Sequence, residues 1–213
     1  MPAFLPPALL LRAYAAGVFP MAGARDDPEV FWVDPPLRGV LPLDGFHLSR
    51  SLARRMRRGG YDVSLNADFE GVVDACADRA ETWISAPIRA AYLDLHARGA
   101  AHSIEVWEEG ALAGGIYGVS LGRAFFGESM VSRRTDGSKR ALAHLVDHLR
   151  RCGFTLFDTQ FITPHLARLG AVEIDRDDYR KRLAAALEGE ADIAALPLER
   201  DPAQVVQRIT HTS

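Results

Sequence analysis

The sequence GGIYGVSLGRAFFGESMVSR, residues 114–133, decides the fold. Its centre, VSLGR at 119–123, lies between two runs rich in aromatic and β-branched residues, with Gly118 and Gly122 at the turn. This pattern predicts a β-hairpin. The second arm carries Glu128 among aromatic and apolar neighbours. A lone carboxylate in that setting costs free energy unless it is paired or faces a cleft, so we expect chemistry at this hairpin.

The stretch FTLFDTQ, residues 154–160, is an apolar run that ends in polar side chains. Asp158 and Gln160 are two positions apart, so on a strand both side chains leave the same face. Here too a carboxylate on an apolar strand needs a partner or a cleft. Candidate chemistry therefore lies on Glu128 of the hairpin and on Asp158 and Gln160 of this strand.

The composition is that of an ordinary globular protein. The 213 residues are 48% hydrophobic and 25% charged, and 25 Lys and Arg against 28 Asp and Glu give a net charge of −3. This balance gives no general attraction for nucleic acid, so an RNA contact must come from a local basic patch. The two cysteines, Cys76 and Cys152, are too few for a disulfide scaffold and indicate buried thiols in a reducing compartment.

No targeting or membrane segment is recognisable in the sequence. The N-terminal apolar run has no basic region before it, and Arg12 interrupts it early. No other stretch approaches the roughly 18–20 apolar residues that a membrane span needs. We expect a cytoplasmic protein without a membrane partner.

The N-terminal part predicts a small subdomain. Residues 7–17 predict a short helix with prolines in its first turn and Gly17 after its end. Prolines 28, 35, 36 and 42 then indicate irregular connecting chain over residues 22–47. We expect an N-terminal subdomain over residues 1–34, packed on a main domain over residues 35–213.

From residue 48 on, apolar periodicity and turn residues predict alternating helices and strands. The first helix is capped by Ser49 and the second by Asn66, while a third begins near Ser85 and ends before Gly99. The remaining predicted elements are strands at 61–65, 102–108, 112–120 and 123–132, a helix at 138–150, a strand at 154–159, a short helix from 163, a strand at 171–174 and a helix at 175–187. Residues after Gly189 predict a loosely ordered tail.

Several motifs, in order along the chain, resemble the signature of the leucyl/phenylalanyl-tRNA–protein transferase family. They are RAYAAGVFPM (12–21), FWVDPPLRGVL (31–41), ETWI (81–84), AHSIEVW (101–107), the hairpin sequence (114–133) and FDTQ (157–160). The resemblance extends from about Leu9 to Tyr179. Several motifs in order are far more specific than any one of them.

The order of elements, helices followed by a three-stranded meander and then α-β-α-β-α, resembles a GNAT-type acyltransferase domain, which the family is known to contain. The expected fold class is α+β, with a mixed, mostly antiparallel sheet flanked by helices. A GNAT acetyltransferase is therefore the rival function. However, SRRTDG at 132–137 has one glycine where a phosphate cradle needs several, and an acid in the wrong place for an anion. We expect no cofactor.

A cluster of arginines is the candidate RNA contact. Five of them lie within nine residues of the first predicted helix of the main domain, so that nearly all of its faces are basic: Arg50, Arg54, Arg55, Arg57 and Arg58. On the sequence alone, a solvated helix with carboxylate partners elsewhere explains them equally well. The resemblance favours a platform for tRNA phosphates, which the planar guanidinium binds through its fork.

The resemblance also implies where the aminoacyl-tRNA binds. Family members stack the terminal adenosine of tRNA between two aromatic residues; Trp83 matches one, and Met21 stands at the other position, where a thioether still contacts a ring favourably. The side-chain pocket for Leu or Phe corresponds to Ile116, Phe125, Leu145, Leu149 and Phe157. Without the resemblance, those five residues would be ordinary core.

The reaction that the resemblance implies needs no nucleophilic residue, because the ester of aminoacyl-tRNA is already activated. No serine, histidine and aspartate at motif spacing and no metal-ligand cluster stand out. The α-amine must be held against the ester carbonyl while it loses a proton. The family assigns the catalytic role to the residues matching Asp158 and Gln160, and Glu128 suits a cationic amine.

We therefore expect an aminoacyltransferase that moves Leu or Phe, and Met less well, from tRNA to proteins beginning with Arg or Lys, which marks them for N-terminus-dependent degradation. A non-catalytic tRNA-binding module is the alternative from another class. The intact Glu128 and Asp158-Thr159-Gln160 argue against it.

Overall fold

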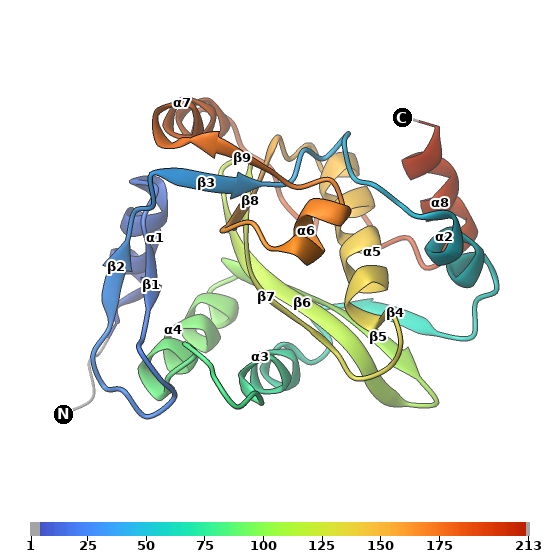
Figure 1. Ribbon diagram of the computed structural model, residues 1–213, viewed down its shortest axis with the longest axis horizontal. Helices are drawn as coiled ribbons and strands as arrows, with labels where there is room; N and C mark the ends of the chain where they lie inside the picture. The colour runs from blue at the N-terminus through green and yellow to red at the C-terminus, as the bar shows by residue number, and fades with distance from the viewer. Residues whose placement is uncertain (1–4, 212–213) are drawn as a thin grey trace.

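The computed structural model describes residues 5–211. A seven-stranded sheet in the order β4-β5-β6-β7-β8-β3-β9 runs through the molecule, with α3 and α4 on one face and α5 on the other (Figure 1). Its strands are β3 Leu37–Val40, β4 Asp62–Leu65, β5 Ala101–Glu108, β6 Ala111–Leu121, β7 Ala124–Ser132, β8 Leu156–Gln160 and β9 Val172–Asp175. This mixed, mostly antiparallel sheet flanked by helices confirms the predicted α+β class.

The helices occupy both faces of the sheet and its ends. They are α1 Pro7–Ala15, α2 Arg50–Arg57, α3 Phe69–Ala77, α4 Ala86–Ala97, α5 Gly137–Arg151, α6 Pro164–Arg168, α7 Arg176–Leu187 and α8 Pro202–Thr210. A separate two-stranded sheet, β1 Phe19–Met21 with β2 Phe31–Val33, lies beside α1. No helix among residues 5–211 is long and apolar enough to cross a membrane.

The predicted hairpin is confirmed as β6 and β7. Gly122 at its turn has φ +56°, a backbone conformation that costs little only for glycine. Further along, Gly118 pairs with Gly127 while Tyr117 pairs with Ser129, so Glu128 has no partner in the ladder. This β-bulge re-aims the side chain of Glu128, as bulges beside functional sites commonly do.

Strands β7 and β8 run parallel and then separate. Ala124, Phe125 and Phe126 pair with Leu156, Phe157 and Asp158, whereas β7 continues to Ser132 without β8 beside it. The other edge of β8 pairs with β3, where Val40 lies opposite Asp158. The sheet is therefore open between β7 and β8 directly after Asp158, next to the bulge at Glu128.

The expectation of irregular chain over residues 22–47 is wrong, because β3 lies within the large sheet between β8 and β9. Pro35 and Pro36 stand just before this four-residue strand, where a missing N–H breaks no ladder. A strand this short forms because partners on both sides pair with it, and no local pattern of four residues reports those partners.

The expectation of a loosely ordered tail after Gly189 is also wrong. Helix α8 packs against α2 and α5 and buries Val205, Val206 and Ile209. The carboxylate of Asp201 caps it by accepting the N–H of Ala203 at 2.9 Å. The sequence DPAQVVQRI did carry this signal, an N-cap and a proline followed by apolar residues on one face.

Two predicted helix starts have different outcomes. Ser49 caps α2, and its Oγ accepts the N–H of Leu52 at 3.3 Å. Asn66 does not cap α3; Asp68 does, through the N–H of Gly71 at 3.0 Å. Asn66 instead has φ +60° and accepts the N–H of Ser103, so it ties the end of β4 to β5.

Candidate active site

Two buried carboxylates lie where β7 and β8 separate. Glu128 is 7% exposed and Asp158 is 0% exposed. Gln160 lies between them: its backbone N–H donates to Asp158 Oδ1 at 2.7 Å, and its side-chain Nε2 donates to Glu128 Oε1 at 2.8 Å. One residue therefore links both carboxylates, and its φ of +60° marks the end of β8.

Asp158 is neutralised by a buried arginine. Arg38 on β3 donates from Nε at 2.9 Å to Oδ1 and from Nη2 at 2.6 Å to Oδ2. The hydroxyl of Tyr179 on α7 donates to Oδ2 at 2.7 Å. We call Asp158, Arg38 and Tyr179 the Asp158 cluster. With Gln160 N–H added, both carboxylate oxygens of Asp158 are occupied within the protein.

Arg38 is itself fixed on all sides, with 1% of its surface exposed. Its guanidinium carbon lies 4.5 Å from the ring centroids of both Phe19 and Tyr179, and its Nη1 donates to the carbonyl of Gly17 at 3.0 Å. Stacking between two aromatic faces suits a weakly hydrated planar cation. The sequence analysis missed Arg38, because it lies in the proline-flanked segment that predicted no strand.

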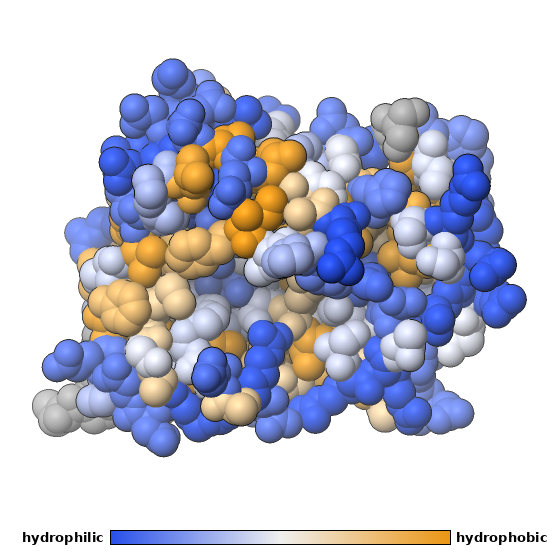
Figure 2. Space-filling model, viewed as in Figure 1, coloured by the Kyte–Doolittle hydropathy of each residue, from blue (hydrophilic) through white to orange (hydrophobic). Residues whose placement is uncertain are grey.

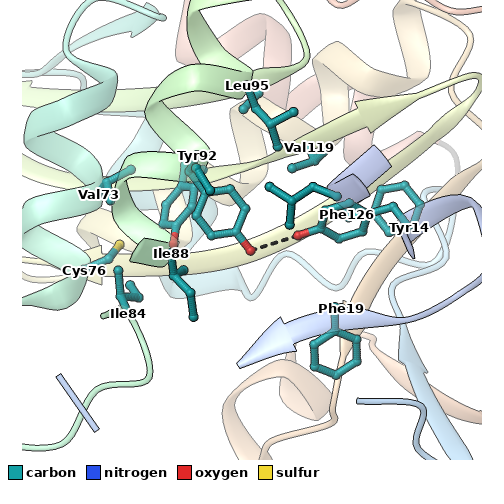
Figure 3. Packing of buried hydrophobic residues seen from close by; sticks show 14 of the residues in the cluster. Tyr14, Phe19, Val73, Cys76, Ile84, Ile88, Tyr92, Leu95, Val119 and Phe126 are labelled. Carbon is teal, nitrogen blue, oxygen red and sulfur yellow. Dashed lines mark hydrogen bonds between the residues drawn. The ribbon is translucent and has the colours of Figure 1, made fainter. Parts of the chain in front are cut away.

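Glu128 has hydroxyl partners but no bonded cation among the described contacts. Tyr14 on α1 donates to its Oε1 at 2.7 Å, and Tyr92 on α4 donates to its Oε2 at 2.5 Å. The two hydroxyl oxygens are 2.8 Å apart, and Figure 3 shows these hydroxyls meeting within the apolar core. We call Glu128, Tyr14 and Tyr92 the Glu128 cluster.

Burial sets the charge states of the Glu128 cluster. It raises the pKa of Glu128 to about 7, against the lowering effect of the two tyrosine hydrogen bonds. It also raises the pKa of Tyr14 and of Tyr92 well above the usual phenol value. The tyrosines therefore remain protonated, and the carboxyl is the group that titrates near neutral pH.

A small cavity of about 80 Å³ opens on Glu128. The other residues that line it are Ile116, Gly127, Ser129, Met130, Leu142, Phe157, Thr159 and Leu166. The structure thus brings Ile116 and Phe157 of the predicted side-chain pocket together with Glu128. It places Phe125, Leu145 and Leu149 in the buried core and not among these lining residues. Phe125 supports the wall from behind, with its ring 5.5 Å from that of Phe157.

Met21 and Trp83 lie together in a second, open pocket of about 590 Å³. Trp83 is half-buried and meets Tyr92 edge-on, with ring centroids 6.4 Å apart. Arg25 in the wall of this pocket donates to the carbonyls of Ala77 and Arg79, which fixes the loop after β1 against the end of α3. The pocket is therefore next to the Glu128 cluster through Tyr92.

All five predicted tRNA-binding arginines, Arg50, Arg54, Arg55, Arg57 and Arg58, are exposed on or directly after α2. Arg55 Nε lies 3.1 Å from Asp136 Oδ2 just before α5. The expectation that nearly all faces of this helix are basic is wrong, because Leu52, Ala53 and Met56 form a buried apolar face. The basic residues therefore lie on one outward side.

The N-terminus of α5, where an acyl-CoA enzyme would hold a diphosphate, has its first two N–H groups engaged within the protein. Ser132 Oγ accepts the N–H of Ser138 at 3.0 Å, and the N–H of Gly137 donates to the carbonyl of Arg134. The carboxylate of Asp136 stands at the same end and pairs with Lys139 at 2.7 Å. An occupied, acid-bearing helix end does not suit an anion.

Apolar side chains gather on the face of the molecule over β3 and β9 (Figure 2). Leu37 on β3, Val172 on β9 and Phe161, which follows Gln160, are each exposed by 42–46%. Among residues 5–211, no group of three or more His, Cys, Asp or Glu side chains is arranged to hold a metal ion. Cys76 and Cys152 are free thiols, buried and half-buried respectively.

The chain matches two protein-family descriptions. "Leucyl/phenylalanyl-tRNA protein transferase" matches residues 40–184, and the N-terminal domain of the same family matches residues 5–36. The leucyl/phenylalanyl-tRNA–protein transferase of Ruegeria pomeroyi is 68% identical over 209 residues, which are 98% of this chain and 99% of that protein. The protein of the same name from Cereibacter sphaeroides (strain ATCC 17025) is 64% identical over 212 residues, or 100% and 99% of the two chains.

Among solved structures, FemX superposes on 67% of this chain with a TM-score of 0.53 and 12% identity, and the match covers 60% of FemX. At that identity the likeness concerns the fold alone. It agrees with the predicted GNAT-like arrangement of a mixed sheet between layers of helices.

Proposed function

Because the chain belongs to the leucyl/phenylalanyl-tRNA–protein transferase family and is an aminoacyltransferase, we propose that it moves Leu or Phe, and Met less well, from tRNA to proteins beginning with Arg or Lys. The observation that carries this proposal is the small apolar cavity that opens on Glu128. An apolar wall rejects polar and charged side chains because they would lose their hydration there.

The donor ester needs no prior activation by the enzyme, so positioning is the main task of the site. An α-amine with a pKa of about 7.7–8.0 is partly neutral already at physiological pH. Holding it against the ester carbonyl removes most of the entropic barrier to attack. In the proposal, Gln160 and Glu128 contact the reacting amino groups. Asp158 positions Gln160, because it accepts the backbone N–H of that residue.

The tRNA is proposed to bind at two further places. The open pocket with Met21 and Trp83 receives the terminal adenosine, and a half-buried Trp edge beside Tyr92 supports stacking there. The exposed arginines of α2, namely Arg50, Arg54, Arg55, Arg57 and Arg58, contact backbone phosphates further along the acceptor arm. Such contacts add affinity without reading bases.

The product would carry Leu, Phe or Met at its N-terminus and would enter N-terminus-dependent degradation. Aminoacyl-tRNA and newly exposed protein N-termini meet in the cytoplasm, which is where we place the reaction.

A direct transfer assay tests this proposal. The protein is incubated with Leu-tRNA and with peptides that are identical except for a first residue of Arg, Lys, Asp or Glu. We expect Leu on the Arg and Lys peptides, and none on a matched Arg peptide whose α-amine is acetylated. Transfer confined to the Asp and Glu peptides would overturn the acceptor assignment, and transfer to none of them would overturn the proposal as a whole.

A further inference from the structure

We propose that Glu128 is a catalytic residue that takes the proton from the α-ammonium group of the acceptor, with Tyr14 and Tyr92 as the positioning residues that hold its carboxyl in either protonation state. This inference rests on the proposed function and assigns the proton acceptor within it.

The positions of the two carboxylates favour Glu128. Its side chain belongs to the wall of the cavity, whereas Asp158 is absent from that wall and 0% exposed. Both oxygens of Asp158 already accept hydrogen bonds from Arg38, and a proton placed there would have to displace the guanidinium. A general base must come within hydrogen-bond reach of the proton that it abstracts. Glu128 satisfies this requirement and Asp158 does not.

The hydroxyls around Glu128 can satisfy both of its protonation states. When the carboxyl is ionised, Tyr14 donates to Oε1 and Tyr92 donates to Oε2, at 2.7 and 2.5 Å. When it is protonated, its O–H can donate to Tyr92, Tyr92 can donate to Tyr14 across 2.8 Å, and Tyr14 still donates to Oε1. The second arrangement is a closed ring in which every hydroxyl hydrogen is used. A proton therefore enters and leaves without orphaning a buried donor.

The electrostatic surroundings agree with a group that exchanges protons near neutral pH. Burial raises the pKa of Glu128 to about 7, close to that of a peptide α-amine. The titratable and charged groups that face it are Tyr14 of α1, Tyr92 of α4, Tyr117 of β6, Asp158 of β8 and Arg38 of β3. Asp158 raises and Arg38 lowers the pKa of Glu128, and these two groups neutralise each other.

The proton balance of the reaction closes with one such residue. The acceptor ammonium gives one proton to the ionised Glu128 and becomes a neutral amine. Its nitrogen attacks the ester carbonyl, and the new C–N bond leaves that nitrogen positively charged. As the ester C–O bond breaks, the nitrogen gives a second proton to the departing ribose oxygen, which becomes a hydroxyl. Glu128 then releases the first proton to water.

The test is the pH course of the Glu128→Gln variant, which keeps the shape and most hydrogen bonds of the site but cannot take a proton. Single-turnover transfer from Leu-tRNA to an Arg-initiated peptide is measured from pH 6.5 to 9, corrected for ester hydrolysis. The neutral fraction of the free acceptor amine rises roughly 30-fold over this range, while the ionised fraction of Glu128 rises only about fourfold. At pH 6.5 we therefore expect the transfer rate of Glu128→Gln to be about 100-fold below that of the parent protein. By pH 9 this difference in rate should be about sevenfold smaller. A ratio of the two transfer rates that is constant with pH would overturn the proposal.

A second donor excludes the case in which Glu128 only binds the ammonium group of the donor. The same series is run with a tRNA ester whose α-amine has been replaced by a hydroxyl. Under the proposal, the rate difference between the parent protein and Glu128→Gln becomes smaller towards pH 9 to the same extent with both donors. If the rate difference becomes smaller with the amino donor alone, Glu128 holds the donor ammonium and the proposal is overturned. The same conclusion follows if the parent protein does not use the hydroxy donor. Transfer by the parent protein tests the proposed function separately.

Tyr92→Phe keeps the inference falsifiable if Glu128→Gln does not fold. It removes a donor to the ionised carboxylate, so the pKa of Glu128 should rise and the rate profile of the variant should move to higher pH. Tyr61→Phe, which removes a hydroxyl that bonds His144 of α5 and has no contact with Glu128, is the matched control and should leave the profile unchanged. An unshifted profile in Tyr92→Phe would contradict a rate that depends on Glu128 ionisation.

Discussion

The carboxylates of the Asp158 cluster and the Glu128 cluster lie on neighbouring strands, are both buried and both accept a hydrogen bond from Gln160, yet they are stabilised in different ways. Asp158 has a guanidinium bonded to both of its oxygens, held between Phe19 and Tyr179. Glu128 has two neutral hydroxyls and an amide. The first arrangement compensates a full negative charge with a full positive one, so removing either ion would leave the other buried and unpaired. The second arrangement offers Glu128 only neutral donors, so it compensates the charge of an ionised carboxylate only in part.

Under the proposed role of Glu128, the difference separates a carboxylate that positions Gln160 from one that takes part in the proton transfer. The Asp158 cluster ties β3, β8 and α7 together and fixes Gln160, since Asp158 accepts its backbone N–H. The Glu128 cluster ties β7 to α1 and α4 and leaves its carboxyl on the cavity wall. In the proposal, the Asp158 cluster positions Gln160, and the Glu128 cluster exchanges a proton.

The largest expected effect follows from breaking the buried ion pair. Arg38→Met should lower the free energy of unfolding by about 3–5 kcal/mol, because it leaves Asp158 charged and unpaired in the interior. Urea unfolding at pH 7.5 measures this loss.

The matched control is the double variant Arg38→Met/Asp158→Leu, which removes both charges and should recover much of the stability. If the double variant loses as much as Arg38→Met alone, then packing around the guanidinium, and not charge pairing, is what Arg38 contributes. That result would end the contrast between the two clusters.

The second effect is a pH dependence that belongs to Glu128. Its pKa is raised from the ordinary 4.5 to about 7 on folding, so between these values the folded chain binds more protons than the unfolded chain. Stability must therefore fall as the pH rises through this window. Comparing the parent protein with Glu128→Gln, we expect the difference in unfolding free energy to change by about 2.5 kcal/mol between pH 5 and pH 7.5, in favour of the variant at the higher pH. A difference that is the same at both pH values would show that Glu128 does not change its protonation state between them.

The sequence predicted the strand that carries each carboxylate, because β7 and β8 are long or apolar enough to show their pattern locally. The hairpin, the capping of α2 by Ser49 and the placement of Glu128, Asp158 and Gln160 on strands are all local properties. The partners of the carboxylates are not. Tyr14 and Tyr92 are buried on the inward faces of α1 and α4, two helices that apolar periodicity predicts. Periodicity reports burial but not which hydroxyl meets which oxygen.

The sequence did not predict Arg38 as a site residue, for a different reason. An arginine among prolines predicts an exposed loop, and burying it pays only if a carboxylate and aromatic rings arrive from distant parts of the chain. Asp158 is 120 positions away from it, so the pair depends on β3 entering the sheet beside β8. The lining of the cavity was predicted only in part, because it too depends on which distant segments come together. Ile116 and Phe157 line it. The other three predicted pocket residues, Phe125, Leu145 and Leu149, belong to the buried core. Apolar strands and helices do not tell which of their residues will be left beside an opening.

The smallest expected effects come from removing one hydroxyl from each cluster. Tyr179→Phe and Tyr14→Phe each delete a buried O–H that donates to a carboxylate oxygen at 2.7 Å. A hydrogen bond to a charged group contributes about 1.5–3 kcal/mol, so both variants should lose stability in this range at pH 8. They should differ at pH 5.5, where Glu128 is protonated and a hydroxyl facing it contributes less. The loss in Tyr14→Phe should shrink there, whereas the loss in Tyr179→Phe should not change, because Tyr179 donates to a carboxylate that is paired with the Arg38 guanidinium. Urea unfolding of both variants at the two pH values provides the measurement. Equal behaviour of the two would mean that the carboxylates are in the same state, and the distinction between a fixed and an exchangeable charge would have to be abandoned.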